Sequence, residues 1–363
     1  MERKYLEIDL KALAHNYRVL ADLAGPGTKM VSVVKADAYG HGLKQAARTL
    51  VDCGTYALGV FDPADAAVIR QEGIKVPIVS LSGIFPWEAG DAAKNNIDAV
   101  IFSMEAAQAL SQAFLEKGET GNVIIKVDTG MGRLGIFPED LPAFVEALAP
   151  LKGIRVTGIA SHLAASEIPD HPHTKSQVEA FKRASLSMIN DTLANSGAVL
   201  EGLAKGVPLA RPGIALYGSA PDPGMKGADL LKPVMTFKTL IISLKTLPQG
   251  SPISYGMTFT TSRPSLIAAV PVGYADGYFR RLANKGAAIV HGKRVPVVGT
   301  VCMNLTMLDV TGIDNVQPGD EVVLLGEKDG LRVTGDELAA SAGTISYEIY
   351  CSLGHANPRQ YKE

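Results

Sequence analysis

Cysteine is scarce in this sequence of 363 residues, which holds only Cys53, Cys302 and Cys351. An odd, widely spaced set without a CxxC pair argues against a disulfide scaffold or a zinc site and is typical of a reducing compartment. The seven histidines show no metal-ligand spacing beyond the HPH run at 171–173, which is more typical of a loop. We therefore expect no metal site.

An excess of charge of either sign is also missing. The 35 Lys and Arg residues nearly balance 37 Asp and Glu residues, so the net charge of −2 gives no reason to expect nucleic acid or an anionic membrane as a partner. No apolar run approaches the ~18 residues of a membrane helix, and the start, MERKYLEIDL, lacks a signal-peptide core. With 47% apolar residues, the chain predicts a cytoplasmic globular protein with a sizeable core.

The first part of the chain alternates between strand and helix patterns. Helical patterns such as GLKQAARTLVDCG and MEAAQALSQAFLEKG end in Gly, as many helices do. Eight strand–helix units over about 230 residues predict a (β/α)8 TIM-type barrel. The alternative is a doubly wound open sheet, but the sequence has no GxGxxG motif after its first strand. The strand patterns are MVSVVKA, YALGVF, VPIVSL, DAVIFS, NVIIKVD, IRVTGIASH, LAN and GIALYG.

The pattern changes near Leu231, after which strands dominate. Segments such as SLIAAVPVGYA and DEVVLLG are strand-like, and the turns between them carry Gly, Pro and Asp. A helical pattern returns only at TGDELAASAG. We expect an α/β protein with a barrel domain over residues 1–232 and a mostly β C-terminal domain over residues 233–363.

Candidate catalytic residues stand at the strand ends, where barrel enzymes carry their active sites. A charge at one strand end is commonly a solvated surface residue, but several that converge favour a site. Lys35 follows a strongly apolar strand, and a partly desolvated lysine has a lowered pKa and can form a Schiff base with a carbonyl, including that of pyridoxal phosphate (PLP). The alternative is a lysine that extends to water. The strand-end residues are Lys35, Lys126, Arg133, His162, Asn195, Ser196 and Arg211.

A bound phosphate needs backbone N–H groups and hydroxyls, which the late loops of a barrel commonly supply. Ser196 and the backbone of Gly213 and Ile214 are in the right part of the sequence, and Tyr39 could add a phenol.

The segment VVKADAYGHG resembles the PLP-lysine motif of bacterial alanine racemases. The similarity continues in order through nearly the whole chain. This resemblance implies a fold-type-III, PLP-dependent isomerase that interconverts L- and D-alanine and supplies D-alanine for cell-wall peptidoglycan. The other matching segments are LEIDLKALAHNY, KVDTGMGRLG, ASHLAASE, LANSG, LARPGIALYG, ISYGMTFT, PVGYADGY, VVGTVCMNLTMLDV and TISYEIYCSL.

The resemblance also assigns catalytic roles. Racemisation is easiest with two bases on opposite faces of the substrate, and these would be Lys35 and the tyrosine of SYG, Tyr255. A free tyrosine is a poor base at neutral pH, so His162 and Arg211 would lie in a chain behind it. Arg211 would also face the pyridine nitrogen and, being always protonated, would leave that nitrogen unprotonated and weaken PLP as an electron sink.

The remaining assignments concern binding and assembly. Arg133 and the backbone N–H of Met303 would anchor the substrate carboxylate, and Lys126 matches a lysine that is carbamylated in many members, the alternative being an unmodified lysine paired with Asp128. In the family, the β domain of one subunit completes the barrel site of the other, which implies a homodimer with shared sites. The cofactor-binding residues implied are Lys35, Tyr39, Asn195, Ser196, Arg211, Gly213, Ile214 and Tyr347.

Three positions depart from the family pattern: Thr300 replaces an arginine, Asn304 an aspartate and Leu163 a phenylalanine. They leave the core reaction intact and leave selectivity between alanine and serine open, because a pocket excludes one added hydroxyl poorly. A broader or serine-preferring racemase is therefore one alternative.

A PLP-dependent decarboxylase would need a glycine-rich phosphate loop and a catalytic cysteine, and Cys351 is the only near candidate for that cysteine. A PLP carrier without turnover would match the first half alone.

Overall fold

The structure is a computed structural model that describes residues 2–168 and 170–363. In it the chain forms two compact units. The barrel unit comprises Leu13–Ala38 and Leu43–Leu231, and the β unit comprises the residues up to Ala12, Tyr39–Gly42 and Lys232–Glu363. The predicted division after residue 232 does not include the two early segments of the β unit.

Eight parallel strands close the barrel, and they follow one another in chain order. The last strand pairs with the first through Lys29↔Leu209 and Met30↔Ala210, which closes the ring. The predicted TIM-type barrel is thus confirmed. Its strands are β2 (Lys29–Val33), β3 (Ala57–Val60), β4 (Ile78–Ser80), β5 (Ile97–Ile101), β6 (Gly121–Lys126), β7 (Ile154–Ala160), β8 (Thr192–Ala194) and β9 (Leu209–Ala210).

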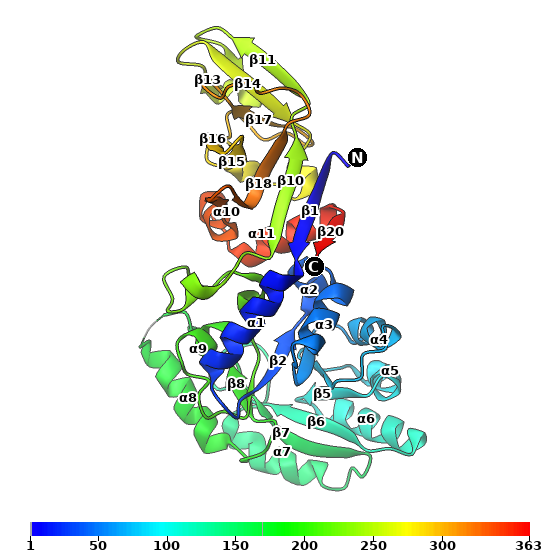
Figure 1. The fold of residues 1–363 in the computed structure, drawn as a ribbon. Helices are drawn as coiled ribbons and strands as arrows, with labels where there is room; N and C mark the ends of the chain where they lie inside the picture. The colour runs from blue at the N-terminus through cyan, green and yellow to red at the C-terminus, as the bar shows by residue number, and fades with distance from the viewer. Residues whose placement is uncertain (1, 169) are drawn as a thin grey trace. The chain divides into compact units, whose positions relative to one another are not determined.

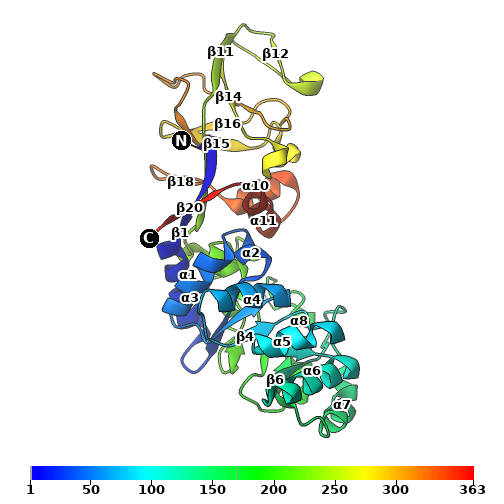
Figure 2. The ribbon, with the colours of Figure 1, turned by 90° about the vertical axis from the view of Figure 1, so that its right-hand side faces the viewer.

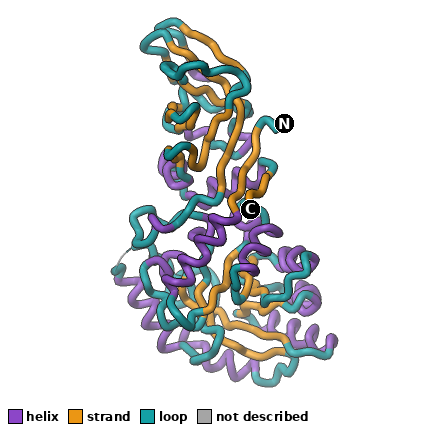
Figure 3. Tube along the Cα trace, in the orientation of Figure 1, coloured by secondary structure: helices purple, strands orange, loops and turns teal. Residues whose placement is uncertain are grey.

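Helices surround these strands, as the purple and orange segments of Figure 3 show, and α4 to α7 follow one another along the outside in Figure 2. The helix α6 illustrates the local cause: the Ser103 hydroxyl accepts the Ala106 N–H at its start, and Gly118 ends it with φ 74°. The helices are α1 (Leu10–Ala24), α3 (Leu43–Asp52), α4 (Pro63–Gln71), α5 (Ala89–Lys94), α6 (Met104–Lys117), α7 (Leu141–Leu148), α8 (Pro172–Ala184) and α9 (Ser196–Leu200).

The barrel interior explains why these short runs are strands. Seven of the eight strands, all except β8, supply small or branched apolar side chains to one layer, and the burial of these side chains stabilises the barrel. This layer is buried throughout. Its members are Val31, Ala57, Val79, Val100, Ile124, Ala160 and Leu209.

Two strand predictions were wrong. GIALYG was expected to be the eighth strand, but β9 is Leu209–Ala210 and Ile214–Tyr217 forms the 3₁₀ helix η3. Pro212 lies between them and has no N–H for a strand ladder, so the strand ends before it. The first barrel strand was expected to end at Lys35, but β2 ends at Val33 and Lys35 opens the short helix α2 (Lys35–Tyr39).

The β unit is built around β10 (Met235–Leu240), which pairs antiparallel with β1 (Lys4–Asp9) and with β18 (Glu321–Lys328) (Figure 1). The first strand of the chain therefore belongs to the sheet of this unit. The mostly β character predicted for the C-terminal part is confirmed. Its seven-stranded sheet also contains β15 (Ala287–Val290), β16 (Lys293–Pro296), β19 (Leu331–Val333) and β20 (Arg359–Lys362).

Two smaller sheets and two helices complete the β unit. Antiparallel pairing joins β11 to β14 and β14 to β17, and β12 pairs with β13. Within residues 2–168 and 170–363, none of the helices has the length and apolarity needed to cross a bilayer. The elements are β11 (Ser243–Leu247), β12 (Pro252–Ile253), β13 (Phe259–Thr260), β14 (Ser265–Val270), β17 (Thr306–Asp309), α10 (Gly335–Ala342) and α11 (Ser346–Ala356).

Candidate active site

Lys35 lies at the C-terminal end of a barrel strand and is half-buried. The four residues that follow it, Ala36 to Tyr39, have φ values of 53–54°, a left-handed conformation that costs an L-residue roughly 1–2 kcal/mol. Hydrogen bonds hold the turn: the Ala38 N–H donates to the Val34 carbonyl (2.9 Å), and the Asp37 carboxylate accepts the Leu43 N–H (2.7 Å). Nothing in the sequence KADAY indicated this turn.

His162 follows β7 and lies among the predicted cationic residues. Burial is the largest cause that lowers its pKa, to about 2, and nearby positive charges add to it. The imidazole is therefore neutral at neutral pH. The residues responsible, largest effect first, are Arg211, Lys126, Arg133 and Lys35. Side chains predicted from four separate strand ends and loops are thus brought into one electropositive group.

Lys126 ends β6 and is buried. Burial, then the charges of Arg211 and Arg133, lower its pKa to about 7, against the opposing effect of Asp128. No ion pair joins Lys126 to Asp128 in the part of the chain that the structure describes. The Asp128 carboxylate accepts backbone N–H groups of the loop 130–133 at 2.7–3.2 Å. That loop presents the exposed Arg133.

Arg211 is buried and held on two sides. Its guanidinium donates to the Thr192 hydroxyl and to the Ser161 carbonyl, the latter at 2.6 Å. Burial lowers the pKa of Arg211 to about 10, so it stays protonated at neutral pH. Sequence reasoning missed both partners. Ser161 directly follows β7 and so carries the signal that identified the other residues, whereas Thr192 begins β8 and does not.

A small cradle of donors forms where α9 and η3 begin. The Asn195 side chain caps α9 by accepting the Ala198 N–H (3.0 Å). The buried Ser196 hydroxyl accepts the N–H groups of Gly213 (2.8 Å) and Ala215 (3.4 Å), so its own proton is left for a further acceptor.

The buried Ile214 is the first residue of η3, and no acceptor for its N–H is found among residues 2–168 and 170–363. Its N–H and the Ser196 hydroxyl proton are therefore two donors suited to an anion.

Tyr39 and Tyr347 belong to the β unit and lie in ring contact, with centroids 5.9 Å apart. Burial, then the neighbouring Tyr347 and Cys351, raise the pKa of Tyr39, so its phenol remains a donor. The loop that carries Tyr39 packs closely, because a Cβ at Gly40 would overlap the Tyr350 carbonyl oxygen.

Tyr255 and Met303 also belong to the β unit, and both side chains are exposed, by 72% and 56%. The structure places Tyr255 at the start of the 3₁₀ turn η5 (Tyr255–Met257) rather than in a strand.

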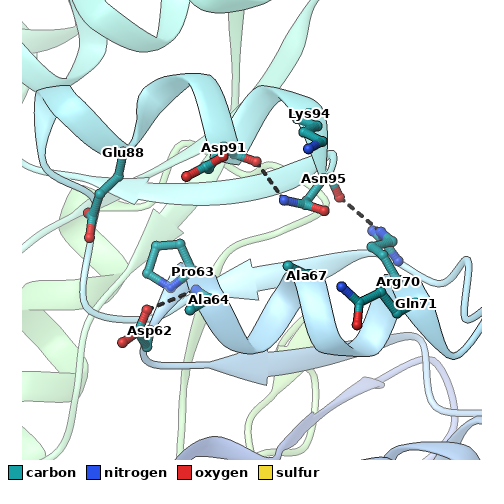
Figure 4. Close-up of a pocket in the computed structure, with 10 residues that line it drawn as sticks. All are labelled: Asp62, Pro63, Ala64, Ala67, Arg70, Gln71, Glu88, Asp91, Lys94 and Asn95. Atoms are coloured by element: carbon teal, nitrogen blue, oxygen red, sulfur yellow. Dashed lines mark hydrogen bonds between the residues drawn. The ribbon is translucent and has the colours of Figure 1, made fainter.

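A separate cavity of about 530 Å³ lies between α4 and α5 on the outside of the barrel (Figure 4). It is lined by acids and bases, and its Arg70 donates to the Asn95 carbonyl (2.9 Å). None of the predicted site residues lines it, so it is not part of the candidate site.

Comparisons with known proteins agree over the whole chain. Family profiles described as "Alanine racemase, N-terminal domain" and "Alanine racemase, C-terminal domain" match residues 8–221 and 234–361. The alanine racemase of Syntrophobacter fumaroxidans is 44% identical, over 98% of this chain and 96% of that protein.

Solved structures agree with this. The alanine racemase of a D-cycloserine-producing Streptomyces lavendulae has a TM-score of 0.92 and 34% identity, over 100% of this chain and 98% of that one. That of Bartonella henselae, described with covalently bound pyridoxal phosphate, has a TM-score of 0.89 and 31% identity, over 100% of both chains.

Proposed function

Because the chain belongs to the alanine racemase family, we propose that it interconverts L- and D-alanine with PLP as its cofactor. The observation that carries this proposal is the convergence of Lys35 and three further basic side chains around a neutral His162. Such a group favours the two anions that the reaction must hold, a phosphate and an amino-acid carboxylate.

The residues present fit PLP. Lys35 would hold it covalently through its ε-amine, and the Ser196 hydroxyl and the Ile214 N–H, two buried donors with protons to give, would bind its phosphate. The family resemblance assigns the rest of this set to Tyr39, Tyr347, Asn195 and Gly213, and Asn195 would act through its cap on α9. When bound, PLP withdraws electrons from the substrate α-carbon and makes its hydrogen acidic.

Arg211 would face the ring nitrogen of the cofactor. Its two hydrogen bonds, to Thr192 and Ser161, fix the plane of the guanidinium. Because it stays protonated, it would donate a hydrogen bond to that nitrogen and leave the nitrogen without a proton. This arrangement limits the electron withdrawal and favours return of the α-proton over side reactions.

Two opposed bases would move the α-proton. Lys35 would act on one face of the substrate and Tyr255 of the partner subunit on the other, so that one base removes the proton and the other returns it. His162, which is neutral, would relay a hydrogen bond to Tyr255 of the partner subunit, and the protonated Arg211 would supply the positive charge behind it. Arg133 and the N–H of Met303 of the partner subunit would hold the carboxylate.

This arrangement requires a homodimer with two shared sites, and mixed inactive chains test it. Subunits carrying Lys35→Ala and Tyr255→Phe are combined under conditions of confirmed exchange. We expect partial racemase activity, because each heterodimer would hold one intact site. No recovery would contradict shared sites.

None of the three cysteines forms a disulfide in the part of the chain that the structure describes, which accords with a reducing cytoplasm. The product D-alanine would serve peptidoglycan synthesis there.

Chiral chromatography of L-alanine incubated with the PLP-loaded protein, with L-serine in parallel, tests the reaction. We expect D-alanine to form faster than D-serine, since no observation in the structure favours serine. Faster D-serine formation would identify a specialised racemase. If neither product forms although PLP is demonstrably bound, the result would favour the carrier alternative and contradict the proposal.

A further inference from the structure

The turn that carries Tyr255 has an unusual backbone. Ser254 has φ 65° and ψ −175°, a combination that is essentially restricted to glycine. Gly256 and Met257 follow with φ values of 72° and 48°. A run of this kind persists only where surrounding contacts determine it.

Two hydroxyls connect this turn to the segment at 299–302. The Thr300 hydroxyl donates to the Tyr255 carbonyl (2.7 Å), and the Ser254 hydroxyl donates to the Thr300 carbonyl (2.6 Å). Each side chain thus binds the backbone of the other segment. Thr300 is only 4% exposed, so water does not compete well for its bond to Tyr255.

A second layer supports Thr300. The Thr258 and Thr300 hydroxyls are 3.3 Å apart. The Asn284 amide donates to the Thr258 hydroxyl (3.1 Å), and its carbonyl oxygen accepts the Gly299 N–H (2.6 Å). Asn284 therefore joins the far end of the turn to the residue before Thr300.

Within its own chain, the Tyr255 side chain receives no such support. It is 72% exposed, and its hydroxyl has no hydrogen-bond partner within residues 2–168 and 170–363. The direction of the phenol therefore depends on the backbone of the turn, because the rotamers open to a side chain follow from its φ and ψ.

We propose that Thr300 is a positioning residue for proton transfer by Tyr255, acting through its hydrogen bond to the Tyr255 carbonyl. This inference rests on the proposed function. In the step concerned, the Tyr255 side chain acts as a phenolate: the α-carbon–hydrogen bond breaks, the proton goes to the phenolate oxygen to give the neutral phenol, and the electron pair stays on the substrate. A displacement of about 1 Å in such a group can slow the step about 100-fold.

Three variants separate positioning from general stability. Thr300→Val keeps the shape of the side chain and removes the hydroxyl, and Thr300→Ser keeps the hydroxyl. Thr306→Val is the matched control: Thr306 is also buried in the β unit, and its hydroxyl donates to the Val272 carbonyl at the same 2.7 Å. Should Thr300→Val fail to fold, Ser254→Ala removes the other bond of the pair and carries the same expectation.

The first measurement is the initial release of deuterium from L- and D-[α-²H]alanine by the PLP-loaded protein. The Tyr255→Phe variant identifies the enantiomer whose release depends on Tyr255. We expect Thr300→Val to slow deuterium release from that enantiomer about 10- to 100-fold and release from the other less than about threefold. In Thr300→Ser and Thr306→Val, the ratio of the two release rates should be close to that of wild type. Equal slowing of both enantiomers, or of neither, would overturn the inference.

The second measurement needs no cofactor. Hydrogen exchange of the amides at 254–258, followed by mass spectrometry in the protein without PLP, should rise in Thr300→Val and not in Thr300→Ser or Thr306→Val. Unchanged exchange would contradict the support we assign to Thr300. If wild-type protein with bound PLP releases deuterium from neither enantiomer, the proposed function fails and the inference fails with it. If wild type is active and Thr300→Val releases deuterium at the same rates, only the inference fails.

Discussion

Lys126 provides the sharpest test of the electrostatics of the site. Its amine is buried beside two arginines, and this surrounding lowers its pKa to about 7. A neutral amine attacks CO2 to form a carbamate and releases one proton, so the two conditions for carbamylation, a free electron pair and nearby positive charge for the product, are both present. We predict that Lys126 is carbamylated when CO2 is supplied.

The magnitude follows from the pKa of the amine. A lysine with the ordinary value of 10.5 has roughly one amine in three thousand neutral at pH 7, whereas a value of about 7 leaves roughly half of them neutral. The reactive fraction of Lys126 is therefore roughly 1500 times that of a surface lysine. Because only the neutral form reacts, the carbamate should increase as the pH rises from about 6 to about 8.

The assay is ¹³C NMR of the protein in buffer equilibrated with ¹³CO2. We expect one carbamate resonance that is lost in Lys126→Gln and abolished by acid. The control variant Lys152→Gln, which changes an exposed lysine, should retain it. A spectrum in which wild type and Lys126→Gln are identical at pH 8 would refute the reasoning.

Three further substitutions test other parts of the structure. Burial raises the pKa of Asp98 to about 6, so ionisation of Asp98 destabilises the folded state above that pH. Asp98→Asn can keep the hydrogen bond from Asn122 and should stabilise the protein by about 1–2 kcal/mol at pH 7.5. At pH 3.5 it should change the stability little, and thermal unfolding at the two pH values measures the difference. Gly40→Ala should destabilise it by about 3 kcal/mol, since φ is 80° and the new Cβ would overlap the Tyr350 carbonyl; a denaturation midpoint equal to wild type would contradict this. Arg211→Lys should lower kcat/KM by at least about tenfold while the absorbance of bound PLP is retained. The reason is that a lysine ammonium lacks the planar guanidinium that binds the Thr192 hydroxyl and the Ser161 carbonyl together.

Much of the barrel was predictable because buried parallel strands are short apolar runs separated by helices with clear ends. The runs at 97–101 and 121–126 and the Gly-terminated helix α6 are examples. The prediction failed at GIALYG, where an apolar run forms a 3₁₀ helix after Pro212, since apolar content alone does not distinguish a buried strand from a buried turn. It also did not place β1, because pairing with β10, more than 200 residues later, leaves no local pattern.

The candidate site was predictable to the extent that its residues end strands. The ends of parallel strands meet at one edge, so the charges at Lys126, His162 and Arg211 could be expected to converge. The neutral state of His162 could not be predicted, because its lowered pKa depends first on how deeply the ring is buried and then on how closely the cations approach. Thr300 stood out only as a departure from the family pattern, and its bond to the Tyr255 carbonyl is visible only in the structure.

The two proposed bases share a feature that no sequence pattern indicates. Lys35 precedes four residues in left-handed conformation, and Tyr255 follows Ser254 at φ 65°. Alanine and serine at such angles cost of order 1–3 kcal/mol each, and neither residue type signals a positive φ in the way that glycine does. In both places a side-chain hydrogen bond, from Leu43 N–H to Asp37 and from Thr300 to the Tyr255 carbonyl, holds the unfavourable backbone. A proton-transfer group must be placed to within a fraction of an ångström, and a backbone with few alternative conformations limits its movement more strictly than a relaxed loop would.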